Sequence, residues 1–203
     1  MSGMHGERSV DDGGSSVDGR AGRAFREVFP KSEAKGAAMR IADSILMEIE
    51  QEAQSTKRAL DRIPEDKLSW KPHPRSYSLG QLALHIAASP GSVAAAAVPH
   101  HVETPSFSQP EPKSRREVLD TFSKSLESAK ETLKKMDDAQ LTSTWTLTKN
   151  GKVLMSVPRM EFVRSILMNH VYHHRGQLSV YLRMLDVPVP SIYGPSADEN
   201  PFA

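Results

Sequence analysis

Four stretches of the chain carry apolar residues three and four positions apart, and this spacing limits the fold more than any other feature of the sequence. Such spacing places the apolar side chains of a stretch along one side of a helix. That side must be buried against another element. We therefore predict an all-α fold, a four-helix bundle, with helices over residues 37–62, 78–98, 114–136 and 158–185.

The connections between these helices have other patterns. Residues 99–113 are rich in Pro and Ser, which predicts a long loop. Asn150-Gly151 lies between two β-prone runs, which indicates a small β-hairpin between the third and fourth helices. Because both connections are long, the helices need not follow a simple up-down-up-down order. Pro90 interrupts the second helix, and we expect a kink there because proline removes a backbone donor.

The first 36 residues differ from the rest of the chain. They are rich in Gly, Ser, Asp and Arg and hold few bulky apolar residues. Such a segment cannot bury enough surface to offset the entropy lost on ordering. We predict a flexible extension over residues 1–36, with Phe25, Val28 and Phe29 as a short docking element, followed by one domain over 37–203.

Composition excludes several classes of protein. Lys and Arg together number 26 against 25 for Asp and Glu, with no basic cluster, so a nucleic-acid partner is not expected. No apolar run approaches the ~20 residues that span a membrane, and no apolar segment indicates a signal peptide. The chain has no Cys, so any metal must be held by His, Asp or Glu. A chain without disulfides fits a reducing compartment, and we expect the cytoplasm.

Three histidines on apolar helix faces indicate a metal site. His170 and His174 are four residues apart, so they lie on the same face of the last helix. His85 lies between Leu82 and Ile86 on the apolar side of the second helix. If these two helices face each other, three imidazoles can bind zinc, nickel or ferrous iron and leave positions open for water or substrate.

Other interpretations of the histidines remain. A His on an apolar face is often a core residue with a satisfied hydrogen bond. His173 competes with His174, although the apolar period favours His174. We expect His100 and His101 to lie at the surface in the long loop. His73, between two prolines, is expected to be structural.

Catalytic groups are harder to identify than metal ligands. Gln177 is positioned to orient a metal-bound water or an imidazole, or it is a polar residue at the edge of the buried face. Glu52 is a candidate general base, although its place at the edge of the apolar stripe favours an exposed residue. Gly176 lies within the helix, where glycine is roughly 1 kcal/mol less favourable than Ala. Either the helix tolerates this cost, or glycine is needed because a neighbouring backbone or a substrate approaches closely.

The C-terminal segment NHVYHHRGQLSVYLRMLDVPVPSIYGPSADE resembles the last helix and tail of the DinB-like metal-binding superfamily. The motif is His-x-x-x-His-Arg-Gly-Gln, present here from His170 to Gln177. A weaker Trp-x-Pro motif is present at Trp70 to Pro72, ahead of His85. The resemblance covers residues 37–197. It implies a bundle with His85, His170 and His174 as metal ligands, and a homodimer.

The resemblance also implies two classes of function. Relatives include metal-dependent hydrolases and transferases or isomerases that use a low-molecular-weight thiol, so a small-molecule substrate or such a thiol is the expected partner. A three-His metal with an open position suits both chemistries. The alternative is a non-catalytic module in which the metal stabilises the bundle or serves a stress-related role. A fold and metal site alone do not define the substrate.

Overall fold

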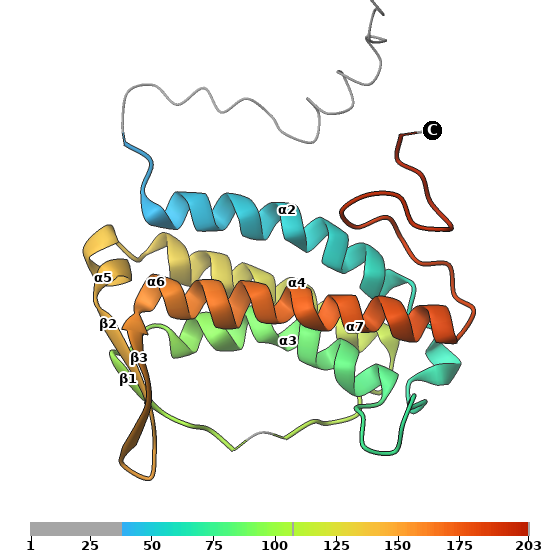
Figure 1. Ribbon diagram of the computed structural model, residues 1–203, viewed down its shortest axis with the longest axis horizontal. Coiled ribbons are helices and arrows are strands. Elements are labelled where there is room, and N and C mark those ends of the chain that lie inside the picture. Colours follow the sequence, from blue (N-terminus) through green and yellow to red (C-terminus); the bar gives the residue numbers. More distant parts are fainter. Residues whose placement is uncertain (1–37, 107, 203) are drawn as a thin grey trace, which may run out of the picture. The chain divides into compact units, whose positions relative to one another are not determined.

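A computed structural model describes residues 38–106 and 108–202 of the chain (Figure 1). The predicted extension over residues 1–36, with Phe25, Val28 and Phe29, lies outside the described residues. Within the described part, no helix is both long enough and apolar enough to cross a membrane.

The described chain is mostly helical, as predicted, with a small sheet of three strands. Most of the helical residues lie in three long helices and in one continuous run near the C-terminus. That run is made of three consecutive segments, of which the middle one is a π-helix. The elements are α2 (Ile41–Asp61), η1 (Glu65–Lys67), α3 (Leu79–Ala96), β1 (His101–Glu103), α4 (Arg115–Lys134), α5 (Asp138–Thr142), β2 (Thr144–Lys149), β3 (Lys152–Pro158), α6 (Arg159–Phe162), η2 (Val163–Asn169) and α7 (His170–Met184).

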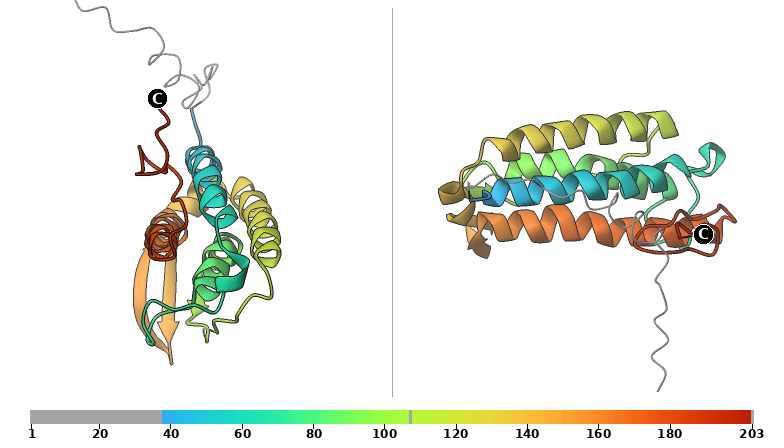
Figure 2. Two further views of the ribbon diagram at one scale, coloured as in Figure 1. Left: turned by 90° about the vertical axis from the view of Figure 1, so that its right-hand side faces the viewer. Right: turned by 90° about the horizontal axis from the view of Figure 1, so that it is seen from above.

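The long helices lie side by side but do not simply alternate in direction (Figures 1 and 2). The helices α3 and α4 run the same way, and α2 and α7 run the opposite way. Gly91 shows how closely α3 and α4 pack, because its amide donates to Ser125 Oγ at 2.7 Å. A Cβ at this position would lie 3.0 Å from the Ser125 carbonyl oxygen, which is tighter than ordinary contact. Because α3 and α4 run in the same direction, the chain that connects them must cross the length of α3.

Two groups of buried apolar side chains hold the helices together. One includes Trp145, whose ring stacks on Phe162 with ring centroids 3.7 Å apart and whose indole N–H donates to the Ala96 carbonyl at 3.0 Å. The other includes Leu82 and Leu178, from α3 and α7, both fully buried. Burial of this apolar surface is the main force that keeps α3 and α7 facing each other.

The sheet confirms the predicted hairpin and corrects the predicted loop. β2 and β3 are antiparallel and are joined at Asn150 and Gly151, with φ angles of 51° and 75°. Positive φ at both central residues is the pattern of a type I′ turn. Residues 101–103, predicted as loop, instead form β1, which pairs with β2 in parallel. The apolar period alone could not reveal β1 because a strand of three residues is too short to show alternation.

Pro90 does not break the helix, because α3 continues through it from Leu79 to Ala96, and the expected kink stays a prediction. Proline removes only one backbone donor. Hydroxyl groups on both sides add bonds of their own, since Ser89 Oγ donates to the His85 carbonyl at 2.6 Å and Ser92 Oγ donates to the Ala88 carbonyl at 3.0 Å. Packing against α4 stabilises the rest of the helix.

The segment after α7 is irregular, as predicted, but it is held by two carboxylates. Asp198 accepts a hydrogen bond from the Val189 amide at 2.8 Å and pairs with Arg183 of α7. Glu199 accepts from the Ser191 amide at 3.0 Å and pairs with Arg58 and Arg62 of α2. This C-terminal segment therefore connects α2 to α7.

Candidate metal centre

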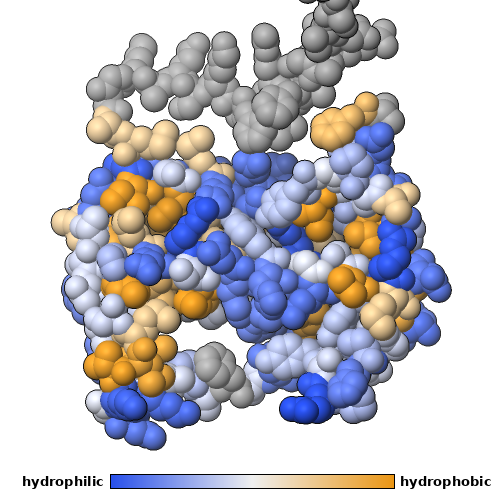
Figure 3. Space-filling view, in the orientation of Figure 1, coloured by the Kyte–Doolittle hydropathy of each residue, from blue (hydrophilic) through white to orange (hydrophobic). Residues whose placement is uncertain are grey.

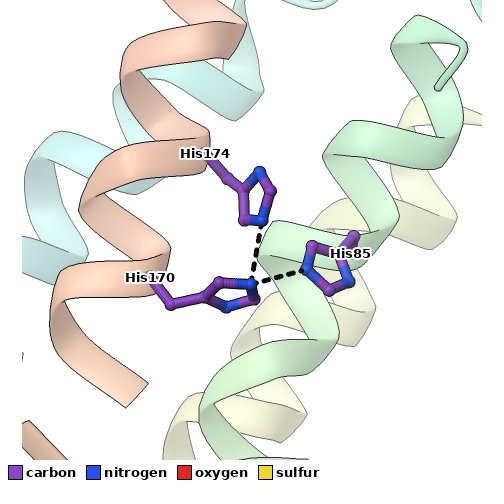
Figure 4. A group of neighbouring side chains, drawn as sticks. All are labelled: His85, His170 and His174. Carbon is purple, nitrogen blue, oxygen red and sulfur yellow. Dashed lines mark hydrogen bonds between the residues drawn. The ribbon is translucent and has the colours of Figure 1, made fainter. Parts of the chain in front are cut away.

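The rings of the three predicted histidines lie together between α3 and α7 (Figure 4). His170 and His174 are one turn apart on α7, and their Nε2 atoms are 2.9 Å apart. His85 reaches them from α3, with its Nε2 atom 3.4 Å from that of His170. One nitrogen from each ring lies within 4.8 Å of the other two, and the group is half-buried. The predicted meeting of imidazoles from two helices is present, and their role as ligands stays a prediction.

The outward-facing nitrogens of the rings have different partners. His174 Nδ1 lies 2.7 Å from Gln177 Oε1. Because an amide oxygen only accepts, Nδ1 carries the proton and Nε2 presents its lone pair to the cluster. His85 Nδ1 lies 3.5 Å from the side-chain nitrogen of Gln109. His170 Nδ1 is buried and has no hydrogen-bond partner among the described residues.

Burial keeps the three histidines neutral. Burial and, to a smaller extent, the neighbouring histidines together lower the pKa of His170 to about 4. Burial also lowers the pKa of His85, together with the charge of His174. For His174, burial lowers the pKa while the hydrogen bond to Gln177 opposes this shift. Neutral imidazoles are the form that binds a metal, so little proton release is needed near pH 7.

The metal-free protein should therefore lose stability as the pH falls from about 6.5 to 4. An unfolded His titrates near pH 6.5, whereas the pKa of His170 in the folded protein is about 4. Between these values the unfolded chain binds a proton that the folded chain does not, so a lower pH favours unfolding. This shift corresponds to about 3 kcal/mol at pH 4, and because the ring is only half-buried, we expect a loss on the order of 2 kcal/mol that disappears above pH 6.5.

Urea unfolding of the metal-free protein across this pH range measures the effect. His170→Gln should make the profile less steep between pH 4 and 6.5, while His73→Gln should leave it unchanged, since His73 is exposed and does not belong to the cluster. Equal slopes for wild type and His170→Gln would contradict the explanation.

The other histidines among the described residues lie where the sequence predicted them, with one correction. His173 is exposed on the outer side of α7, although its ring contacts that of His174 at 5.0 Å between centroids. His100 and His101 are exposed, but His101 belongs to strand β1 and its Nε2 lies 2.6 Å from Thr148 Oγ1. His73 Nδ1 accepts a hydrogen bond from the Arg75 amide at 3.2 Å within its turn.

Glu52 is not the exposed residue expected from the sequence. Its carboxylate accepts from Arg175 at 2.6 Å and from the Tyr193 hydroxyl at 2.9 Å. Arg175 is only 1% exposed, and it also donates to Thr56 Oγ1 at 3.1 Å. Burial and the Glu52 carboxylate raise the pKa of Tyr193. These contacts occupy Glu52 in an ion pair between α2 and α7, which leaves no support for it as a general base.

The buried Arg175 is the residue that sequence reasoning missed. None of the residues predicted to form the site on the last helix is charged, yet Arg175 is buried, together with Met168 and Val171. The π-helix over Val163–Asn169 directly precedes His170 and alters the period on which that prediction was based. The one available signal was the Arg that follows His174 in the motif.

The structure shows a contact predicted for Gln177 but no close approach at Gly176. Gln177 contacts the His174 imidazole, one of its two predicted roles. A Cβ at Gly176 would meet nothing within 4 Å, so no neighbouring backbone among the described residues approaches it. The structure therefore gives no protein contact that requires glycine at this position.

A hollow of about 900 Å³ lies beside the three histidines. All three line it, together with residues of α3, of α4 and of the crossover segment between β1 and α4. The crossover segment runs along the lower edge of the molecule in the view of Figures 1 and 3. The histidine cluster is therefore reachable by a small molecule.

The three rings fit a divalent transition metal by their chemistry. Three neutral nitrogens form a donor set of the kind that zinc, nickel and ferrous iron accept. The hydrogen bond of His174 to Gln177 is the outer contact that commonly orients a ligating imidazole. Among the described residues, His, Asp and Glu supply three donors to this cluster and not four.

The chain is similar to known proteins over most of its length. The family model described as DinB family matches residues 38–200. A Bacillus subtilis protein, YrdA, whose description is uncharacterized, is 26% identical over 157 residues, which cover 77% of this chain and 90% of YrdA.

Solved structures show the same fold. A DinB-like protein from Bacillus cereus has a TM-score of 0.62 and 26% identity, and the match covers 74% of this chain and 97% of the other. A second DinB-like protein, YjoA from Bacillus subtilis, has a TM-score of 0.58 and 19% identity, with 73% and 96% covered.

Proposed function

The chain belongs to the DinB family, and we propose that it is a metal-dependent enzyme with one divalent transition metal held by His85, His170 and His174. Its fold, in this proposal, is the four-helix bundle of DinB-like proteins with a small sheet added. The reaction is hydrolysis or transfer involving a low-molecular-weight thiol. The observation that carries the proposal is a cluster of three half-buried histidines that also lines a hollow of about 900 Å³.

The open hollow favours catalysis over a purely structural metal. Structural metal sites are normally closed by four protein ligands, whereas catalytic sites keep a position for water or substrate. The described residues bring three donors to the cluster, and the same three rings face the hollow. When bound, a divalent metal supplies a Lewis acid and lowers the pKa of a coordinated water or thiol.

The residues around the cluster have separate tasks in this proposal. Gln177 holds the proton of His174 on Nδ1, which keeps Nε2 free to bind. Gln109 lies on the outer side of His85 and limits the movement of that ring. Partial burial of the cluster keeps the imidazoles neutral.

Metal loading followed by two activity assays tests the proposal. The purified protein is incubated with zinc, nickel or ferrous iron, desalted and analysed for metal, and about one metal per chain is expected. The loaded protein is then assayed for ester hydrolysis and for transfer of cellular thiols to an electrophile. Activity that disappears on chelation supports the enzyme. A protein that retains no metal would reject the proposal.

The second candidate is a non-catalytic module stabilised by the metal. The contacts that join α2, α7 and the C-terminal segment would suit such a role, because they hold the helix that carries His170 and His174. Retention of one metal per chain with no activity in either assay would favour this candidate. A homodimer and a cytoplasmic location complete the proposal, and size-exclusion chromatography with light scattering tests the first of these.

A further inference from the structure

The hollow beside the histidines is lined by negative charge and by no positively charged Lys or Arg among the described residues. Among its described lining residues there is no Lys and no Arg, and Glu117 of α4 is the one carboxylate. Proteins normally bind carboxylate or phosphate groups with Arg or Lys. A ligand that carries such groups would therefore meet no cation here other than a bound metal.

Glu117 is available to a ligand. Its Oε2 accepts a hydrogen bond from the Lys113 amide at 2.7 Å. Within residues 38–106 and 108–202, Glu117 is in no ion pair, unlike Glu127 and Glu131 farther along the same helix. A half-buried carboxylate without a cation attracts a positive group more strongly than a fully solvated one, because the local dielectric is lower.

Two of the hydroxyl groups that line the hollow favour the same class of ligand. Ser89 Oγ donates its proton to the His85 carbonyl, and Ser92 Oγ donates to the Ala88 carbonyl. Both serines line the hollow, and with their protons used they can only accept further hydrogen bonds. Accepting groups suit a ligand with N–H donors. Aliphatic side chains such as Leu84, Val93 and Ile166 cover other parts of the wall.

We propose that the substrate of this site is a small molecule with an aliphatic part and a positively charged ammonium group, and that Glu117 binds the ammonium group. This inference deepens the proposed function, since it takes the hollow beside the three histidines as the substrate site. It disfavours thiol cosubstrates that carry several carboxylates. In this proposal Glu117 selects which substrate binds. It lies on α4, a different helix from those of the proposed metal ligands.

Three thiols of equal length test the charge preference: 6-amino-1-hexanethiol, 6-mercapto-1-hexanol and 6-mercaptohexanoate. Each is titrated into cobalt-loaded protein, where binding of the sulfur changes the cobalt absorption spectrum. The same probes are titrated into the metal-free protein and followed by amide ¹H–¹⁵N shifts. The amine should bind about tenfold more tightly than the carboxylate, with the alcohol between them.

Two variants connect the preference to Glu117. Glu117→Gln keeps the size and the accepting oxygen but removes the charge, and it should reduce the amine-to-carboxylate ratio to about twofold or less. Asp120→Asn removes the same charge from an exposed position of α4 outside the hollow, and it should keep the tenfold ratio.

The outcomes separate this inference from the proposed function. A carboxylate probe that binds as tightly as the amine, a ratio unchanged in Glu117→Gln, or no shifts with any probe would overturn the inference. A wild-type protein that takes up no cobalt would reject the proposed metal site instead. In that case the metal-free titration still decides whether the hollow prefers the ammonium group.

Discussion

Replacing His174 by Ala should reduce the bound metal from about one per chain to nearly none. His174 contributes one of three nitrogens in the cluster, and its Nε2 lies 2.9 Å from that of His170. Two remaining imidazoles bind a divalent metal far more weakly than three, so we expect a loss in affinity of at least roughly 100-fold. Elemental analysis of zinc-loaded, desalted protein measures the result.

His173→Ala is the matched control for this experiment. His173 is the neighbouring residue on the same helix, but it is exposed and does not belong to the cluster. Both substitutions remove one imidazole and have the same effect on helix propensity, so they differ only in the position of the ring. His101→Ala, on β1, should also leave the metal content unchanged. Equal metal in the His173 and His174 variants would reject the assignment of the ligands.

Replacing Arg175 by Met should destabilise the protein by about 3–5 kcal/mol. The Arg175 side chain is 1% exposed, and its ion pair with Glu52 is one of several contacts that join α7 to α2. Methionine fills a similar volume but leaves the Glu52 carboxylate, itself only 14% exposed, without its cation. Tyr193 would also lose its contact with the guanidinium group. Urea unfolding of the metal-free protein measures the loss.

Arg183→Met provides the comparison on the same helix. Arg183 pairs with Asp198, but its side chain is 49% exposed, so removal of this solvent-screened pair should cost far less than removal of the buried one. The double variant Arg175→Met with Glu52→Gln should recover part of the stability, because no buried charge is left unpaired. A loss below about 1 kcal/mol for Arg175→Met alone would show that the buried ion pair contributes little.

The helices and the hairpin were predictable because their signals are local. Apolar spacing within one helix and the Asn150-Gly151 turn depend on residues close in sequence. The short strand β1 was not predictable, since it exists only through pairing with β2, whose residues lie more than 40 positions away. The same holds for the continuous path of α3 through Pro90, which depends on packing against α4.

The three histidines of the candidate site were predictable from the sequence, but their surroundings were not. His170 and His174 share a face at any regular helical spacing, and His85 stands among the apolar residues of its own helix. The role of Glu52 depends on Arg175, which is 123 residues away, and burial of an arginine is the opposite of what its polarity suggests. The π-helix before His170 made the burial of Arg175 harder to predict, because it altered the helical period over seven residues.

The sequence by itself determined the mostly helical fold, the hairpin and the identity of the three histidines, because each follows from the spacing of side chains along a single element. Only the tertiary structure decided that α3 and α4 run in parallel and that the crossover between them forms one wall of the hollow. It also decided that Glu52 is neutralised by Arg175, whereas Glu117 has no cation among the described residues. The physical reason is that charge pairing and cavities depend on distances between elements, which the helical period within one element does not specify.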